Sequence, residues 1–232
     1  MTCPATHRAE DQWQCGGLCC GWSMERASHN SLGAGRRGHR RIGLLGGSFN
    51  PAHDGHVHIS LLALKRLRLD EVWWLVAPQN PLKPTAGMAP LQDRLATARA
   101  LIRSRRIRAT DIERRLGTRY TVDTVAALQR RFPEVRFVWL IGADNLLELP
   151  NWHRWKDLLG RVPIAVFARR PYSLSALSGP AAQRFARFRL REAAAGALAS
   201  RKPPAWVFLH CRTHPASATA IRESRRANSR EA

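Results

Sequence analysis

The chain has 232 residues and a formal net charge of +21, with 38 lysines and arginines against 17 aspartates and glutamates. This length fits one α/β domain with a tail, or at most two small domains. No apolar run approaches the roughly 20 residues that a membrane span needs, and the N-terminus lacks the apolar segment of a signal peptide. We therefore expect a cytoplasmic protein with no membrane contact.

The basic residues are almost all arginines, and they are dispersed along the chain. A positive field of this size attracts phosphorylated substrates and also polyanions. Because the basic residues lack interleaved aromatic residues, we favour an arginine-rich solvated surface over a nucleic-acid-binding protein. Contact with nucleic acid is expected to be nonspecific.

Residues 1–40 are rich in Gly, Ser, His, Arg and Cys and show no sustained periodicity. Four of the five cysteines lie here, but Cys3 is isolated and Cys19 and Cys20 are adjacent, which fits neither zinc ligands nor a disulfide framework in a reducing compartment. We interpret this segment as a disordered extension, or as the result of a start that truly lies at Met24. The predicted boundaries are 1–40 for the extension, 41–226 for the folded domain and 227–232 for a C-terminal tail.

From Arg41 onward, short apolar runs alternate with helical patterns, which is typical of a parallel sheet wrapped by helices. The predicted strands are 42–45, 71–77, 106–112, 135–141, 164–167 and 206–209. The predicted helices are 57–64, 90–104, 121–132, a long arginine-studded stretch at about 176–199, and a C-terminal helix. We therefore predict a single α/β domain with a Rossmann-like parallel sheet of order 3-2-1-4-5 and helices on both faces. Ligands should bind at the carboxyl ends of its strands.

The segment Gly46–His56, with the sequence GGSFNPAHDGH, joins the first predicted strand to the first predicted helix. Its paired glycines let the backbone turn sharply and leave room for a ligand to approach the main chain. The first turn of the helix presents unpaired N–H groups and the positive end of the helix dipole. His53 and His56 lie three residues apart and share a face once helical. These features predict a site for a nucleotide phosphate.

Further polar residues follow the later predicted strands, at the same edge of the sheet. Lys83 ends a proline-rich loop after the second strand, and Gly142 and Asp144 follow the fourth. Gly142 would permit close approach of a nucleotide, and Asp144 could accept hydrogen bonds from substrate hydroxyl groups. Thr121 begins a helix, where it fits both an N-cap and an anion site.

Trp152 follows Pro150 and Asn151 in a loop, outside any apolar strand, which favours a role as a stacking platform for a flat ring. Four other tryptophans lie in or beside apolar strands, and we assign them to the core: Trp73, Trp74, Trp139 and Trp206. Near the C-terminus, the hydroxyl groups of Ser217 and Thr219 at a helix start, with Arg222 one turn later, would form a receptor for triphosphate oxygens.

In order and spacing, these segments resemble the motifs of the nicotinate-nucleotide adenylyltransferases, over roughly residues 41–226. Residues 46–56 are similar to the family pattern GGxF(D/N)PxHxGH, residues 120–124 to YTxDT, and residues 141–155 to IGADxxxxxxxWxxW. Residues 167–171 resemble a strand-to-loop passage near the adenine that ends in arginine and proline. Residues 217–222 resemble SSTxIR, but Ala218 replaces the second serine and removes one hydroxyl contact.

The resemblance implies an enzyme that transfers the AMP moiety of ATP to nicotinate mononucleotide, forming deamido-NAD and pyrophosphate in NAD biosynthesis, with Mg²⁺ accompanying ATP. It implies that His53 and His56 are catalytic. It assigns ATP binding to Gly47, Ser48, Phe49, His53, His56, Gly142, Asp144, Ser217, Thr219 and Arg222. It assigns binding of the acceptor substrate to Lys83, Thr121, Trp152 and His153. No protein residue is assigned as a metal ligand.

Two alternatives stay open at this point. The acceptor could be nicotinamide mononucleotide or another phosphorylated compound, because the preference for a ring carboxylate over an amide is the weaker inference. A basic RNA-binding protein that has kept a Rossmann-like shell is the alternative without enzymatic activity. Whether the protein forms homo-oligomers, and which of Arg169 and Arg170 contacts the nucleotide, is not fixed by the sequence.

Overall fold

The protein is described by a computed structural model over residues 39–79, 87–169 and 171–211. Several residues assigned to the site from the sequence lie outside these ranges: Lys83, Arg170, Ser217, Thr219 and Arg222. Residues 1–38 of the predicted N-terminal extension, the predicted C-terminal helix and the C-terminal tail also lie outside the described residues. Arg40, predicted to end the extension, is instead the first residue of the first strand.

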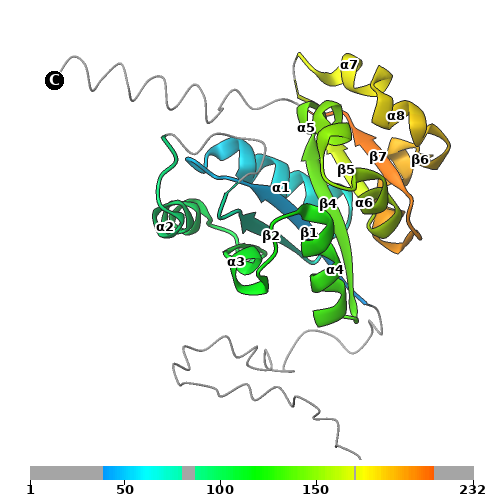
Figure 1. Ribbon diagram of the computed structural model, residues 1–232. Coiled ribbons are helices and arrows are strands. Elements are labelled where there is room, and N and C mark those ends of the chain that lie inside the picture. The colour runs from blue at the N-terminus through cyan, green and yellow to red at the C-terminus, as the bar shows by residue number, and fades with distance from the viewer. Residues whose placement is uncertain (1–38, 80–86, 170, 212–232) are drawn as a thin grey trace, which may run out of the picture. The chain divides into compact units, whose positions relative to one another are not determined.

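The described residues form one parallel sheet of seven strands, in the order β3-β2-β1-β4-β5-β7-β6 (Figure 1). The strands are β1 (Arg40–Gly47), β2 (Glu71–Val76), β3 (Ile107–Thr110), β4 (Val135–Gly142), β5 (Ile164–Phe167), β6 (Arg189–Leu190) and β7 (Trp206–Leu209). The predicted Rossmann-like order 3-2-1-4-5 is confirmed, and β7 and β6 extend the sheet beyond β5.

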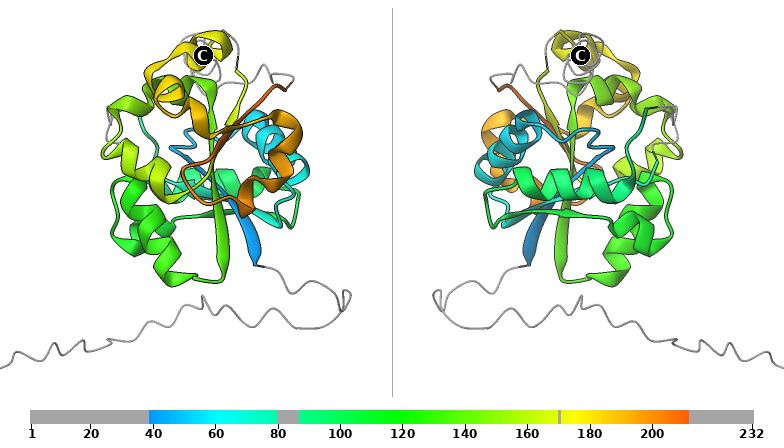
Figure 2. Two further views of the ribbon diagram at one scale, coloured as in Figure 1. Left: turned by 90° about the vertical axis from the view of Figure 1, so that its right-hand side faces the viewer. Right: turned by 90° about the vertical axis from the view of Figure 1, so that its left-hand side faces the viewer.

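Helices cover both faces of this sheet, as predicted (Figure 2). One face carries α1 (Asp54–Arg66), α2 (Leu91–Leu101) and the 3₁₀ helix η3 (Glu192–Ser200). The other face carries α3 (Ile112–Leu116), α4 (Thr121–Arg131), α5 (Ala143–Glu148), α6 (Trp155–Arg161), α7 (Ser173–Ser178) and α8 (Pro180–Arg184). Two further 3₁₀ turns are η1 (Leu149–Asn151) and η2 (Ala186–Phe188).

The strands are apolar on both sides because both faces of the sheet are covered. Successive residues of β2 alternate between the two cores: Trp73 and Leu75 pack with α3 and α4, whereas Val72 and Trp74 pack with α1 and α2. Every residue of β2 is buried. The four tryptophans predicted to lie in the core are all buried, which confirms that prediction.

The predicted helical stretch at about 176–199 is wrong. Gly179 has extended backbone angles, and Pro180 has no N–H to continue a helix, so the chain breaks into α7 and α8 at this point. The short strand β6 then pairs with β7, and η3 follows it as a 3₁₀ helix. A strand of two residues is too short to show an alternating pattern in the sequence.

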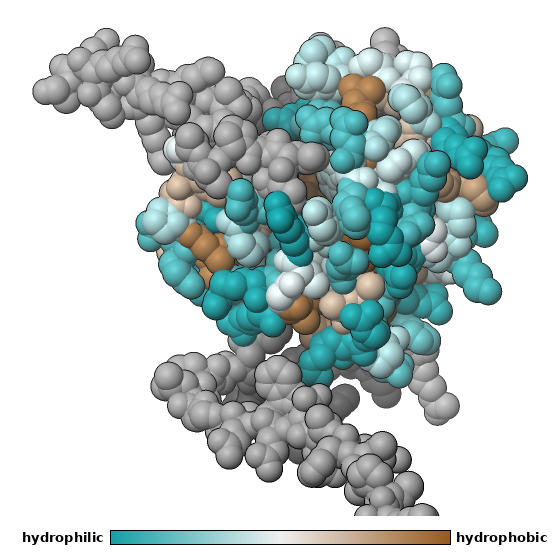
Figure 3. Space-filling view, viewed as in Figure 1, coloured by the Kyte–Doolittle hydropathy of each residue, from teal (hydrophilic) through white to brown (hydrophobic). Residues whose placement is uncertain are grey.

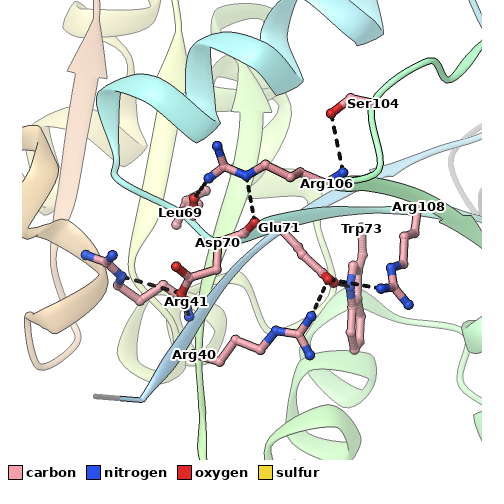
Figure 4. Close-up of polar contacts among 9 residues, drawn as sticks. All are labelled: Arg40, Arg41, Leu69, Asp70, Glu71, Trp73, Ser104, Arg106 and Arg108. Atoms are coloured by element: carbon pink, nitrogen blue, oxygen red, sulfur yellow. Dashed lines mark hydrogen bonds and ion pairs between the residues drawn. The ribbon is translucent and has the colours of Figure 1, made fainter. Parts of the chain in front are cut away.

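At the amino ends of the strands, arginines from neighbouring strands converge on the buried Glu71 (Figure 4). Arg40 of β1 and Arg108 of β3 pair with its carboxylate, which also accepts a hydrogen bond from Trp73 Nε1 at 2.9 Å. Two arginine cations and an indole N–H donor offset the cost of removing the Glu71 carboxylate from water. This network ties three strands together at the edge of the sheet opposite to the predicted site.

The face shown in Figure 3 is mostly hydrophilic, with small separate apolar areas. Among the described residues, the large hydrophobic side chains that are exposed are Leu61 and Tyr172. Within the same ranges, no helix combines the length and apolar character required to cross a lipid bilayer.

Candidate active site

The predicted nucleotide site lies where the order of the strands reverses, between β1 and β4. Parallel strands on either side of such a point leave a crevice at their carboxyl ends, and ligands of α/β proteins bind there. β1 ends at Gly47 and β4 ends at Gly142. The register pairs Leu45 with Leu140, so its continuation brings the two glycines level with each other.

Phe49 fixes the shape of the loop that follows β1. Its φ of 48° lies in the left-handed region, which is costly for a bulky residue and is held only by its surroundings. The ring is 2% exposed and stacks on Trp74 with centroids 5.1 Å apart. Its other neighbour is the ring of His56, at 4.7 Å. The aromatic core beneath the loop therefore holds this strained turn and the second histidine together.

The two histidines of the motif face each other, with ring centroids 3.9 Å apart. His53 is the N-cap of α1, and His56 lies in the first turn. The backbone N–H of His53 donates to His56 Nδ1 at 3.2 Å, and the backbone N–H of His56 donates to His53 O at 2.9 Å. The prediction that both rings lie on one face at the helix start is therefore confirmed.

His56 is neutral in this setting. Burial, together with the adjacent His53 and more weakly Arg169, lowers its pKa to about 3, against an opposing effect of the hydrogen bond from the His53 backbone. Because Nδ1 accepts the His53 N–H, the single ring proton resides on Nε2. His56 therefore presents a fixed N–H donor without a positive charge of its own.

The support for His56 extends into β2 through buried hydrogen bonds. Ser60 Oγ donates to His56 O at 2.8 Å, and Trp74 Nε1 donates to Ser60 Oγ at 2.7 Å. Ser60 and Trp74 are fully buried. This chain of contacts fixes the first turn of α1 on the sheet and limits the freedom of the histidine.

At the end of β4, Asp144 pairs with Arg169, which follows β5. Arg169 Nη1 donates to Asp144 Oδ2 at 2.8 Å. Asp144 Oδ1 is buried and has no hydrogen-bond partner among the described residues. A Cβ on Gly142 would lie 2.3 Å from this oxygen, so the glycine provides the space that the carboxylate occupies. The carboxyl ends of β4 and β5 are thus joined by an ion pair between Asp144 and Arg169.

The two segments assigned to the acceptor substrate contact each other. The ring of His153 stacks on Tyr120 with centroids 4.2 Å apart, and Arg154 pairs with Asp123 in the first turn of α4 at 3.8 Å. Trp152 is half-buried and packs against the core on the α4 face. The loop after η1 and the start of α4 therefore lie against each other.

One detail of this region differs from the prediction. The N-cap of α4 is Tyr120, and Thr121 is the first helical residue, so the prediction of Thr121 as N-cap is wrong by one position. The Tyr120 carbonyl accepts the N–H groups of Asp123 and Thr124 at 3.0 Å. The N–H of Thr121 remains in the first turn, where helix amide groups lack intrahelical partners.

Glu113 carries a partly buried carboxyl group next to the start of α4. Thr124 Oγ1 donates to it at 3.5 Å and lies 2.8 Å from Thr118 Oγ1. Burial raises the pKa of Glu113 to about 7, and the Thr124 hydrogen bond acts in the opposite direction. The neutral form of this carboxyl group is therefore favoured in the folded protein.

Replacing Glu113 by glutamine should remove a pH-dependent loss of stability. The pKa of Glu113 is about 7 in the folded protein, above the value of 4.5 for the unfolded chain. The contribution of the protonated Glu113 to the free energy of unfolding is therefore fully present below pH 4.5 and is lost as pH rises to 7. We expect the free energy of unfolding of the wild type to fall relative to Glu113→Gln by on the order of 2 kcal/mol between pH 5 and pH 8. Urea titrations at both pH values measure this difference, with the exposed Glu134→Gln as control. A constant difference between wild type and Glu113→Gln would show that Glu113 does not titrate in this range.

Two residues of the site were not identified from the sequence. Arg169 could not be distinguished from Arg170, and the ion pair with Asp144 now places Arg169 at the site. The second is Arg94, which is 3% exposed and donates to backbone carbonyls of the loops after β1 and β2. The helical spacing in the sequence could have indicated that Arg94 is buried, because it places Arg94 on the apolar face of its helix with Leu91, Leu95 and Ala98.

The described residues contain no group of three or more His, Cys, Asp or Glu side chains that could hold a metal ion. Mg²⁺ is commonly bound through substrate phosphates with one or two carboxylates. Asp144 is a carboxylate at the site, although its Oδ2 is engaged by Arg169.

A Rossmann-like sheet with a glycine–histidine loop at its switch point defines a class of nucleotide-binding transferases, and the family comparison agrees. Residues 44–224 match the model described as cytidylyltransferase-like, and the chain belongs to this family. Similar proteins named "Probable nicotinate-nucleotide adenylyltransferase" come from Parvibaculum lavamentivorans, 54% identical over 79% of this chain and 91% of that protein, and Gluconobacter oxydans, 56% identical over 79% and 94%. A third, from Cereibacter sphaeroides, is 55% identical over 80% of this chain and 98% of that protein. The resemblance found in the sequence is thereby confirmed.

Among solved structures, the fold is similar to that of the Plasmodium falciparum nicotinic acid mononucleotide adenylyltransferase complexed with NaAD. The TM-score is 0.61, and the match covers 80% of this chain and 83% of that one. The sequence identity is 16%, so this likeness concerns the fold.

Proposed function

We propose that this protein transfers the adenylyl group of ATP to nicotinate mononucleotide, producing deamido-NAD and pyrophosphate in the biosynthesis of NAD. The observation that carries this proposal is the pair of rings formed by His53 and His56, with centroids 3.9 Å apart, at the start of α1 and at the switch point of the sheet. Relatives more than 50% identical that are named nicotinate-nucleotide adenylyltransferases support the same reaction.

The reaction is an in-line displacement at phosphorus. A 5′-phosphate oxygen of the mononucleotide forms a bond to the α-phosphorus of ATP, while the bond from that phosphorus to the bridging oxygen breaks and pyrophosphate leaves. Such transfers depend on positioning and on charge stabilisation more than on covalent catalysis. No protein nucleophile is required.

The side chains at the site would divide this work. His56 Nε2–H would donate to a non-bridging oxygen of the α-phosphate, where charge develops in the transition state. His53 and the N–H groups at the start of α1 would hold the neighbouring phosphates. Mg²⁺ bound to the triphosphate would neutralise charge on the departing pyrophosphate.

The remaining residues would bind the two nucleotides. Asp144 would accept hydrogen bonds from hydroxyl groups of the ATP ribose at its buried, unpartnered Oδ1. Thr121 and the first amide groups of α4 would bind the pyridine carboxylate, with Trp152 and His153 beside the ring. Ser217, Thr219 and Arg222, outside the described residues, would contact the outer phosphates of ATP, and Lys83, also outside them, would contact the acceptor substrate.

The proposal is tested by pyrophosphate release from ATP, with nicotinate mononucleotide and nicotinamide mononucleotide supplied in parallel. We expect pyrophosphate release when ATP and nicotinate mononucleotide are present together. The rate of release should be higher with nicotinate mononucleotide than with nicotinamide mononucleotide. A preference for the nicotinamide compound would reassign the acceptor. Release with neither, together with tight and salt-sensitive RNA binding, would favour the RNA-binding alternative.

A further inference from the structure

Arg94 of α2 is a buried cation without an acidic partner among the described residues. Its side chain is almost fully enclosed, and it donates four hydrogen bonds, all to backbone carbonyls. Burying an arginine is expensive unless its donors are satisfied, and here four of its five N–H groups are. Within the described ranges, no carboxylate neutralises the positive charge.

The four carbonyls belong to three separate segments of the carboxyl edge of the sheet. Nη1 donates to Ser48 O at 2.6 Å in the glycine–histidine loop and to Ala77 O at 2.8 Å after β2. Nη2 donates to Pro78 O at 3.0 Å, and Nε donates to Ala89 O at 2.8 Å before α2. One guanidinium group therefore joins the loop after β1 to the loop that leads toward residues 80–86.

The contact to Ser48 acts directly on the strained turn. The C=O and N–H of a trans peptide point in opposite directions, so fixing Ser48 O also fixes the direction of the Phe49 N–H. Phe49 is the residue with a φ of 48°, a conformation that its surroundings must hold. Arg94 holds this peptide from one side while the Trp74 and His56 rings hold the Phe49 side chain.

We propose that Arg94 is a positioning residue for the triphosphate: it fixes the backbone of the glycine–histidine loop against the loop after β2 and places an uncompensated positive charge behind the phosphate site. This inference rests on the proposed function for the identity of the ligand. It predicts a defect in ATP binding, because the shortest hydrogen bond of Arg94 goes to Ser48 O in the glycine–histidine loop, on the ATP half of the site. The acceptor half, at Tyr120 and His153, receives no hydrogen bond from Arg94.

The test compares Arg94→Met and Arg94→Lys with wild type. Arg99→Met serves as a matched control, because Arg99 lies on the same helix and is exposed. The measurements are KM for ATP, KM for nicotinate mononucleotide, and the Kd of α,β-methylene-ATP in the absence of acceptor. We expect Arg94→Met to raise KM for ATP and the Kd about 10- to 100-fold, with KM for the acceptor unchanged. Arg94→Lys keeps the charge but not the planar fork, so we expect a smaller increase in the same two constants.

Unchanged constants for ATP, or equal increases in both KM values, would overturn the proposal and indicate a merely structural arginine. If Arg94→Met does not fold, Arg94→Lys decides by the same comparison. The failure of the proposed function is a separate outcome: wild type would then form no dinucleotide, although the Kd for the ATP analogue could still depend on Arg94.

Discussion

Replacement of His56 by alanine or asparagine is expected to lower adenylyl transfer by about 100- to 1,000-fold, the cost of losing one hydrogen-bond donor to a transition-state oxygen. The asparagine variant is the sharper test. Its side-chain oxygen can accept the His53 N–H in place of Nδ1, but it offers no donor at the position of Nε2. The loop geometry should therefore survive while the donor is lost, and kcat should fall more than KM changes.

His58→Ala is a suitable control, because His58 lies two residues further along α1 and points to a different face of the helix. Circular dichroism and thermal unfolding would verify that the His56 variants remain folded. Near wild-type turnover in folded His56→Asn and His56→Ala would contradict the assignment of His56 as a catalytic residue.

Replacement of Asp144 by alanine is expected to raise KM for ATP by about 10- to 100-fold, the range for hydrogen bonds to a charged group. The variant removes the buried Oδ1 and also leaves Arg169 without its partner at the site. Asp144→Asn retains an acceptor oxygen without the charge, so its effect should be smaller. Steady-state kinetics with saturating acceptor measure both variants.

Asp157→Asn provides the control, since Asp157 forms an exposed pair with Arg154 at 2.8 Å and lies outside the nucleotide half of the site. Its KM for ATP should match wild type. If Asp144→Ala leaves KM for ATP unchanged, or raises KM for both substrates equally, Asp144 does not bind the nucleotide in the proposed manner.

The central sheet could be predicted from the sequence because each strand carries a strong local signal. β5 and β7 begin and end at the predicted residues, since both are short apolar runs buried on two faces. The region around Gly179 and Pro180 could not be predicted in the same way. Its alanines and arginines suit a helix by propensity, but the proline, the short strand β6 and the packing of η3 decide the local structure there.

Parts of the candidate site could also be predicted from the sequence, and other parts could not. Residues within one motif, such as His53 and His56, could be placed together because their spacing alone fixes their relation on a helix. Contacts between distant segments could not, since they depend on the sheet register and on loop paths. Arg169 with Asp144, and Arg94 with Ser48, are separated by 25 and 46 residues and meet only in the folded chain.

The pH-dependent behaviour was likewise invisible in the sequence. Glu113 is one of several acidic residues in an arginine-rich stretch, and nothing in its neighbours along the chain indicates a pKa of about 7. Its burial behind Thr118 and Thr124 arises from the packing of α3 against α4.

The central claim is that the site joins the adenylyl group of ATP to nicotinate mononucleotide. It is tested most directly by incubating the purified protein with MgATP and nicotinate mononucleotide and quantifying both products by mass spectrometry. We predict deamido-NAD and pyrophosphate in equal amounts, with neither formed by His56→Asn above trace levels. Pyrophosphate accompanied by AMP and no dinucleotide, or no turnover of ATP at all, would contradict the account.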